Sequence, residues 1–343
     1  MEDDSEFAVT PVVRTGALRP VIVALDGSGL AARAVPVGVL LARRRQTSLL
    51  LMRVAPPESP ADMFGYQIGE RQDERAIAEE YLAREVARVR KAHPEFEVSS
   101  VVLSGTPSRA LIEAQAEHSP QLTIVTSHGR SALARMIRGS VTEELIRGTT
   151  GSTLVLWPWS LPDRPSTDEP VLPTSAGTTE VPMGRRILVP LDGSARTARV
   201  VPEAFRLARD AGGEVLLLSV LDLHGVRPSR ALDLERAVLH ALEQRATTIE
   251  AAGVPARVEV IVSPDVAGSI ISAAARCQSD TIAMTTHARG ALGKFVFGSV
   301  ANRVASRAAR TVLFTPPHDG LESFEHVYPD VPPAILDLAA LPH

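Results

Sequence analysis

The chain of 343 residues contains one segment twice. Residues 128–141 and residues 287–300 both begin with His and both end in Gly-Ser-Val. The likeness reaches further, because residues 23–28 (Val-Ala-Leu-Asp-Gly-Ser) return as residues 189–194 (Val-Pro-Leu-Asp-Gly-Ser), 166 positions later. The chain is long enough for two domains of ordinary size, so this repeat predicts a duplicated domain.

The composition is typical of a soluble globular protein, with 45% hydrophobic and 22% charged residues. The 36 basic and 40 acidic residues give no net field that would attract nucleic acid or an anionic membrane, so neither is expected as a partner. No apolar run reaches the roughly 20 residues of a membrane span, and the acidic N-terminus lacks the order of a signal peptide. These features predict a cytoplasmic protein.

Within each repeat, short β-rich runs alternate with helical patterns. Strands are expected at 21–25, 48–54, 97–103, 122–126 and 153–157, and again at 187–191, 215–221, 256–262, 281–285 and 311–315. Helices are expected at 29–44, 71–91, 108–118 and 141–147, and again at 195–210, 231–252, 266–277 and 300–307. Near-continuous apolar strands indicate burial on both faces. The prediction is therefore two tandem, doubly wound α/β domains, each with a five-stranded parallel sheet.

The boundaries follow from composition. Domain 1 is expected at 18–160, a linker rich in Pro, Ser and Thr at 161–184, and domain 2 at 185–317. Residues 318–343 are expected to form a tail, whose apolar run at 334–341 is a candidate for docking on the body.

Two local features have structural interpretations. The run Arg43-Arg44-Arg45 ends a predicted helix, where positive charge is favourable, so we do not interpret it as a binding patch. Cys277 is the single cysteine, which excludes an intrachain disulfide. It lies among alanines on a predicted helix and is expected to be a small buried residue.

Each repeat places an aspartate directly after its first strand. Asp26 and Asp192 both precede a Gly-Ser turn. Such an acid accepts hydrogen bonds from ribose hydroxyls in nucleotide-binding folds, and ligands of these folds bind outside the carboxyl ends of the strands. The alternative is a helix cap, because Ser28 and Ser194 resemble helix starts and Asp is common near them.

The repeated segment supplies a loop rich in glycine. Gly129 and Gly139 leave room for backbone N–H groups to approach an anion, and Ser140 is expected to cap the next helix with its hydroxyl toward that anion. Neither a P-loop nor a dinucleotide motif is present. His128 and His287 lack companions at metal-ligand spacing and lack a nucleophile, so no metal site and no catalytic residue are predicted.

At these residues the chain resembles a tandem universal stress protein. The family pattern has an Asp after the first strand, a Val at the end of the second, and Gly-x-x-Gly, nine residues, then Gly-[Ser/Thr]. The matches are Asp26, Val54, Gly129, Gly139, Ser140 and Val141, and then Asp192, Val220, Gly298, Ser299 and Val300. The departures are Thr126 and Thr285 in place of the first Gly, and Ala288 in place of the second.

The resemblance implies an ATP- or ADP-binding stress-response regulatory protein, with Mg²⁺ as a candidate companion of the phosphates. It implies a nucleotide site in repeat 1 formed by Ala24, Leu25, Asp26, Val54, Val125, Thr126, His128, Gly129, Gly139, Ser140 and Val141. The corresponding site in repeat 2 has Pro190, Leu191, Asp192, Val220, Met284, Thr285, Ala288, Gly298, Ser299 and Val300. It also implies a pseudo-dimer in which the last strands of the two repeats pair and cover their edges.

Little or no hydrolysis is expected, because no positioned base is assignable and phosphoryl transfer depends on such positioning. Two alternatives stay open. A scaffold that binds no nucleotide is favoured by the two threonines. A transferase that uses ATP would need a substrate site, for which the inserted loop 55–69 with Met63, Phe64 and Tyr66 is the candidate. A protein partner and further self-association are compatible with each alternative.

Overall fold

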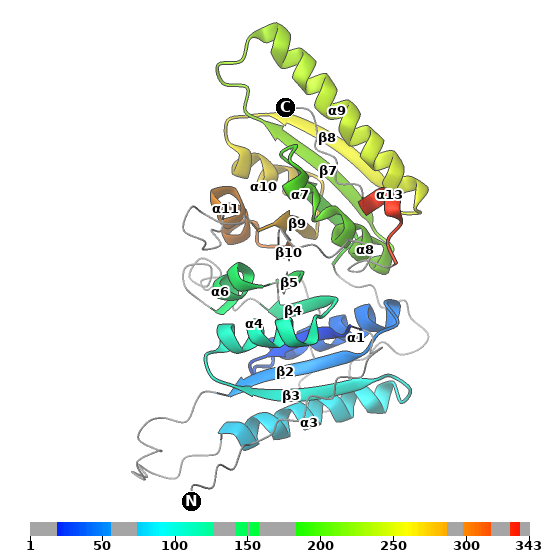
Figure 1. Cartoon of the computed structure of the whole chain (residues 1–343), viewed down its shortest axis with the longest axis vertical. Coiled ribbons are helices and arrows are strands. Elements are labelled where there is room, and N and C mark those ends of the chain that lie inside the picture. The colour runs from blue at the N-terminus through cyan, green and yellow to red at the C-terminus, as the bar shows by residue number, and fades with distance from the viewer. Residues whose placement is uncertain are drawn as a thin grey trace, which may run out of the picture.

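The computed structural model describes residues 19–55, 74–126, 141–149, 151–157, 183–286, 298–316 and 330–336. In this part of the chain, ten strands form one sheet in the order β3-β2-β1-β4-β5-β10-β9-β6-β7-β8 (Figure 1). The strands are β1 (Val21–Leu25), β2 (Leu49–Ala55), β3 (Val98–Ser104), β4 (Leu122–Thr126), β5 (Thr153–Leu156), β6 (Arg186–Pro190), β7 (Glu214–Leu221), β8 (Ala256–Val262), β9 (Thr281–Thr285) and β10 (Thr311–Thr315).

Each half of the sheet is parallel, and the two halves meet at an antiparallel pair. Leu154 of β5 lies opposite Leu313 of β10, while neighbouring strands within each half pair in parallel. The predicted fold class and the predicted pairing of the last strands are therefore confirmed. Because β5 and β10 run in opposite directions, the carboxyl ends of the strands in one half point the opposite way from those in the other half.

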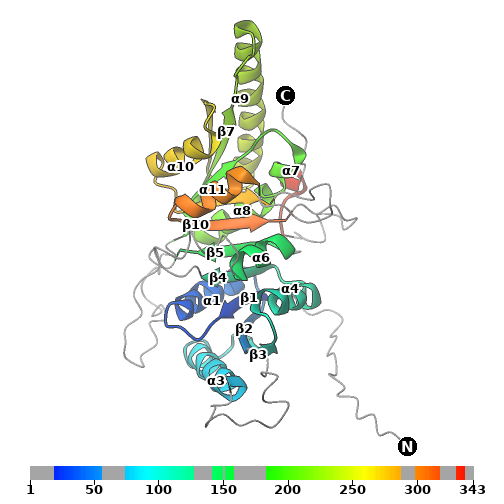
Figure 2. The same cartoon turned by 90° about the vertical axis from the view of Figure 1, so that its left-hand side faces the viewer.

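Helices cover both faces of the sheet (Figure 2). The long ones are α1 (Ala34–Arg44), α3 (Glu74–Ala92), α4 (Pro107–His118), α6 (Val141–Gly148), α8 (Val201–Ala211), α9 (Pro228–Ala251), α10 (Val266–Arg276) and α11 (Ser299–Arg307). Short helical segments are η1 (Ala31–Arg33), α7 (Ala195–Ala198) and α13 (Pro333–Leu336). None of the helices in the described ranges is both long enough and apolar enough for a membrane crossing.

Alternate residues of each strand supply two separate hydrophobic cores. One core packs α1, α3, α8 and α9 on what we call the α1 face, and the other packs α4, α6, α10 and α11 on the α4 face. Both cores include strand residues from both halves, for example Leu154 and Leu313 on the α1 face. The two halves therefore share continuous cores.

The first predicted helix of each repeat is divided into a short segment and a longer helix. A single helix is expected at 195–210, but the structure has α7 and then α8, which starts at Val201. In repeat 1, the expected helix at 29–44 is replaced by η1 followed by α1. Pro202 and Pro36 occupy corresponding positions in the repeats and lack the N–H that a continuous helix needs. Proline therefore accounts for both interruptions.

Gly38 allows α1 to lie directly on the sheet. An ideal Cβ at this position would overlap Cγ2 of Val23 and lie 3.0 Å from Cδ1 of Leu49. We expect Gly38→Val to lower the free energy of unfolding by about 1–3 kcal/mol, because overpacking displaces neighbours in a dense core. Urea unfolding measures the change. Gly29→Ala is the control, since nothing lies within 4 Å of its Cβ, and equal losses in both variants would contradict the packing argument.

A buried ionic contact joins the two halves on the α1 face. Arg45 follows the last residue of α1, and its Nη2 lies 2.8 Å from Oε1 of Glu203 while its Nε lies 2.7 Å from Oδ2 of Asp210. The Arg45 side chain is fully buried. Burial alone would lower the pKa of Arg45, but the Glu203 and Asp210 carboxylates outweigh it and raise the pKa. The interpretation of Arg45 as a simple C-terminal charge is therefore incomplete, because its partners belong to the other repeat.

The described part of the tail docks beside α8 and α9. Val331 and Ile335 are buried in the core of the α1 face, so the prediction that the apolar run at 334–341 packs on the body is confirmed for its described part, 334–336. Asp330 anchors this segment by ion pairs with Arg206, at 3.2 Å, and with Arg209. Burial raises the pKa of Asp330, but the charges of Arg206 and Arg209 outweigh it, and the pKa lies below its ordinary value.

This lowered pKa predicts acid-sensitive docking of the tail. A carboxyl group with a lower pKa in the folded state stabilises the fold above its unfolded pKa, and loses this contribution as the pH falls through the folded value. We expect the melting temperature to fall between pH 5 and pH 3 by less in Asp330→Asn than in the wild type. An identical acid dependence in both proteins would show that Asp330 does not stabilise the fold.

Candidate functional site

In each half, the order of the strands creates a switch point at which a ligand can bind. β1 lies between β2 and β4, with α1 leaving on one face of the sheet and α4 arriving on the other. β6 lies in the same way between β7 and β9. Ligands of doubly wound sheets bind outside the carboxyl ends of the strands at this crevice. The two candidate sites therefore lie at the carboxyl ends of the strands in each half, and these ends point in opposite directions.

The structure brings the predicted strand-end residues of each site together. Register pairs Leu25 with Arg53 on β2, so Asp26 follows β1 beside Val54. Register also pairs Val23 with Ile124, which sets Thr126 beside the end of β1. In the second half, Pro190 pairs with Leu218, so Asp192 and Val220 are neighbours in the same way.

Both aspartates are exposed and are held by a local turn. Oδ1 of Asp26 accepts a hydrogen bond from the backbone N–H of Ser28 at 2.8 Å. Oδ1 of Asp192 accepts bonds from Ser194 N–H at 2.9 Å and from the hydroxyls of Ser194 and Thr197, each at 2.7 Å. The structural role that the sequence offers for these acids is therefore present, and it fixes each carboxylate at the edge of its sheet. Ribose binding stays a prediction.

The predicted apolar residues divide between the two faces. Most of them pack against the core of the α4 face, on which α6 and α11 begin: Ala24, Val54, Val125, Val220, Met284 and Val300. Leu25 and Leu191 instead belong to the core of the α1 face. Thr126 and Thr285 follow the same alternation and are buried on that face as well. A ligand on the α4 face would therefore meet only the backbone of these four residues.

The Gly-Ser pair at 298–299 lies at the start of α11. The cap is predicted at Ser140, which lies outside the described ranges; at the equivalent position of repeat 2, Gly298 is the N-cap residue and Ser299 is the first helical residue. Gly298 has φ −59° and ψ 146°, and no side chain caps the first turn. A helix that begins without a side-chain cap exposes N–H groups and partial positive charge, which suits an anion. In repeat 1, α6 begins at Val141.

Several predicted residues lie outside the described ranges. These are His128, Gly129, Gly139, Ser140, His287 and Ala288, together with the inserted loop beyond Ala55. The contacts that orient the two helices after these loops are described. Asp265 caps α10 and accepts two hydrogen bonds from Arg303 of α11, at 2.7 and 3.0 Å, and Ser108 of α4 donates to Glu144 of α6. Each half thus ties the helix that follows the glycine loop to the preceding helix.

Arg53 is a residue at this edge that the sequence did not single out. Its Cζ lies 5.2 Å from the centre of the Tyr81 ring and 2.8 Å from the position that a Cβ on Gly27 would occupy. Gly27 has φ +88°, so both the turn and the approach of the guanidinium require glycine. The sequence did hold a signal for this residue, because Arg53 is the one charged residue in the otherwise apolar strand at 49–55. Repeat 2 has Ser219 at this position, so the two edges differ in charge.

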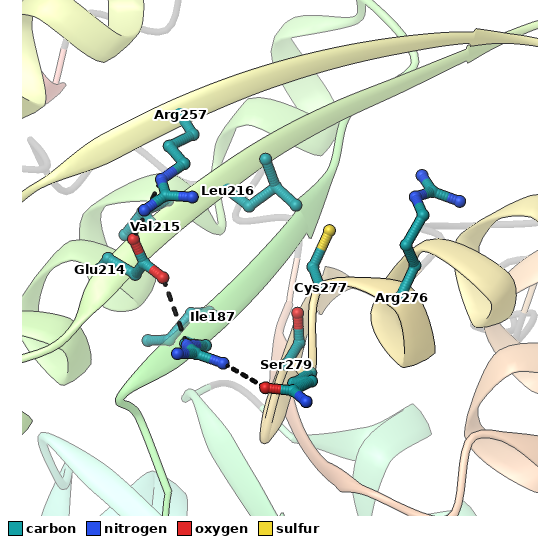
Figure 3. Close-up of a pocket in the computed structure, with 10 residues that line it drawn as sticks. Ile187, Glu214, Val215, Leu216, Arg257, Arg276, Cys277 and Ser279 are labelled. Atoms are coloured by element: carbon teal, nitrogen blue, oxygen red, sulfur yellow. Dashed lines mark hydrogen bonds and ion pairs between the residues drawn. The ribbon is translucent and has the colours of Figure 1, made fainter.

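A cavity of about 340 Å³ lies at the amino ends of β6, β7 and β8. Figure 3 shows the residues that line it. Asp192 follows the other, carboxyl end of β6. Glu214 pairs with both Arg186, at 3.4 Å, and Arg257, at 3.3 Å, on one wall. Cys277 lines the cavity and is half-buried, so the expectation of a buried cysteine is wrong. Its place at the C-terminal end of α10 exposes it. In the described ranges, no three His, Cys, Asp or Glu side chains are grouped as metal ligands.

Comparison with known proteins agrees with this architecture. Universal stress protein Rv2005c of Mycobacterium tuberculosis (strain ATCC 25618 / H37Rv) is 32% identical over 136 residues, which is 40% of this chain and 44% of that relative. The chain thus matches less than half the length of this curated relative. A universal stress protein structure from Archaeoglobus fulgidus DSM 4304 has a TM-score of 0.63 at 18% identity and covers 88% of this chain and 99% of that one.

A functionally unknown protein from Pseudomonas aeruginosa PAO1 has a TM-score of 0.58 at 17% identity, with 94% and 97% of the two chains covered. At these identities the two solved structures show the fold alone. The model of the universal stress protein family matches residues 17–156 and 183–316, which include both halves of the sheet and most of the chain. The chain therefore belongs to the universal stress protein family.

Proposed function

We propose that the chain binds an adenine nucleotide, ATP or ADP, at the carboxyl edge of its first half, and that it acts as a nucleotide-responsive regulator in a stress response. One observation supports this most strongly. An exposed carboxylate, Asp26, is fixed by its turn at the switch point, beside apolar residues of the face on which α6 begins. A carboxylate suits ribose hydroxyls, and a helix N-terminus suits phosphate.

The apolar wall suits the base. Ala24, Val54 and Val125 are half-buried or buried on the α4 face, next to the strand ends. Small apolar side chains in such a position can contact the flat surface of an adenine ring, while the neighbouring polar groups fix its orientation. Mg²⁺ would enter with the triphosphate, whose oxygens would coordinate it.

The first half is the better candidate for the site. Repeat 1 keeps the glycine at 129, whereas repeat 2 has Ala288, whose Cβ restricts the backbone. We therefore infer one stronger site in repeat 1 and a weaker one in repeat 2.

A regulatory role is proposed rather than an enzymatic one. The motifs of the P-loop and dinucleotide enzymes are absent from the sequence, and phosphoryl transfer needs a positioned base or metal clamp. Hydrolysis is expected to be slow at most. A cytoplasmic location, a protein partner and further self-association belong to this proposal too.

The proposal can be tested by measuring whether nucleotide stays bound to the protein during purification. We expect acid extraction of the native protein, followed by chromatography, to release ATP or ADP, and we expect little phosphate release when excess ATP is added. Rapid turnover of ATP alone would contradict the regulatory role. Turnover only in the presence of a metabolite mixture would favour the transferase.

A further inference from the structure

The ionic contact between the two halves is asymmetric. Arg45 belongs to the first half, and its partners Glu203 and Asp210 both belong to α8 of the second half. The two repeats correspond at an interval of 166 residues in this region. The backbone supports this correspondence, because Gln46 and Gly212 both have positive φ, at 51° and 64°. Each residue of the contact can therefore be matched to its counterpart in the other repeat.

The counterparts do not carry the matching charges. Arg45 corresponds to Ala211, and Glu203 corresponds to Val37. Asp210 corresponds to Arg44. Among the charged groups of this contact, the first half therefore contributes Arg45, and the second half contributes both carboxylates. Arg206 and Arg209 of the second half also lie beside these carboxylates, at 3.4 Å from Glu203 and 3.8 Å from Asp210.

This asymmetry bears on the pairing of like halves. The antiparallel contact between β5 and β10 relates the halves by an approximate twofold axis, so two first halves could meet in the same geometry. Arg45 of one copy would then face Val37 and Arg44 of the other, and no carboxylate would neutralise it. Two second halves would bury Glu203 and Asp210 against Ala211, without Arg45.

We propose that this buried ion pair selects the partner of each half: the surface around Arg45 accepts a second-half surface that carries Glu203 and Asp210 and rejects a copy of itself. The partner is thus the unlike repeat, which the same chain supplies. Removal of one member of a buried pair leaves an uncompensated charge, which is far more costly than the pair is favourable. Discrimination of this kind works through the penalty on wrong partners.

The geometry of the contact supports selection more than stabilisation. Nη1 of Arg45 is buried and has no hydrogen-bond partner among the described residues. A buried guanidinium with one nitrogen unsatisfied contributes little net stability, since apolar residues of similar volume often serve as well. The proposal is independent of nucleotide binding.

Charge reversal in the full-length chain tests it. One variant is Arg45→Glu and the other is Glu203→Arg/Asp210→Arg, so that each opposes like charges across the interface. We expect each alone to melt at a lower temperature than the wild type. When the two are unfolded together and refolded as a mixture, we expect a species of twice the chain mass that contains both, measured by light scattering and mass spectrometry. All three substitutions in one chain should restore the wild-type mass and raise the melting temperature above that of either parent variant. The wild-type melting temperature is not expected, because Glu203 also pairs with Arg206 of its own helix, at 3.4 Å.

Arg44→Glu is the matched control, because Arg44 is exposed one residue away and carries the same change of charge. It should keep the wild-type mass and melting temperature. If Arg45→Glu has the melting temperature and the mass of the wild type, the proposal is overturned. It is also overturned if neither the mixture nor the triple variant recovers folded protein, whether or not the parent variants fold.

Discussion

Replacing Arg45 by methionine should lower the free energy of unfolding by about 3–5 kcal/mol, because two buried carboxylates lose their nearest cation. Among the described residues, Glu203 then keeps only Arg206, at 3.4 Å, and Asp210 keeps only Arg209, at 3.8 Å. Glu203 is fully buried and the Asp210 side chain is only 3% exposed, so water cannot replace the guanidinium. The pair also lies where the two halves share a core, so the loss should affect the whole sheet. Urea unfolding followed by circular dichroism gives the midpoint that reports the change.

Two further variants isolate the cause. Arg44→Met removes an exposed charge next to Arg45 and should change stability by less than about 0.5 kcal/mol. The variant Arg45→Met/Glu203→Met/Asp210→Leu removes all three charges together and should recover most of the lost stability, because neither carboxylate is left behind. Arg206, which loses Glu203 in this variant, keeps its ion pair with Asp330, at 3.2 Å. A single Arg45→Met variant that unfolds at the wild-type urea concentration would refute the account of this interface.

Asp26→Asn should weaken the binding of ATP about tenfold or more while the fold is kept. The amide oxygen of asparagine can still accept the hydrogen bond from Ser28 N–H, so the turn is preserved. The charge that would accept the ribose hydroxyls is lost, and hydrogen bonds to charged groups are the stronger ones. Calorimetric titration of nucleotide-free protein measures the change.

Asp192→Asn is the internal comparison for this prediction. Its carboxylate oxygen accepts from three donors of the same turn, and repeat 2 is the weaker candidate site. We expect a smaller loss of affinity, with an unchanged melting temperature in both variants. An Asp26→Asn protein that binds ATP as tightly as the wild type would remove Asp26 from the site.

The sequence predicted the fold well because its signals are local and occur twice. Three strands of the second half, at 256–262, 281–285 and 311–315, have the predicted bounds. The pairing of β5 with β10 followed from the resemblance and from the need to cover strand edges, whereas its antiparallel direction came from the structure. The interruption between α7 and α8 was missed, although Pro202 signalled it.

The contacts between the halves could not be predicted in the same way. Arg45 and Asp210 are distant in sequence and meet only after the two cores join, so the Arg43–Arg45 run gave no sign of a buried partner. The candidate site was predicted as a set of strand ends, which local pattern does define. The face on which each side chain lies, such as Val54 on the α4 face and Leu25 on the α1 face, required the packed sheet.

Calorimetric titration of the nucleotide-free chain with ATP and Mg²⁺, repeated on Gly139→Val and Gly298→Val, tests the central claim most directly. A branched side chain before either helix should block the approach of phosphate to the helix N-terminus. The account predicts saturable binding near one equivalent that Gly139→Val abolishes and Gly298→Val leaves largely intact. Absence of binding to well-folded wild-type protein would contradict the nucleotide-binding function and favour a scaffold.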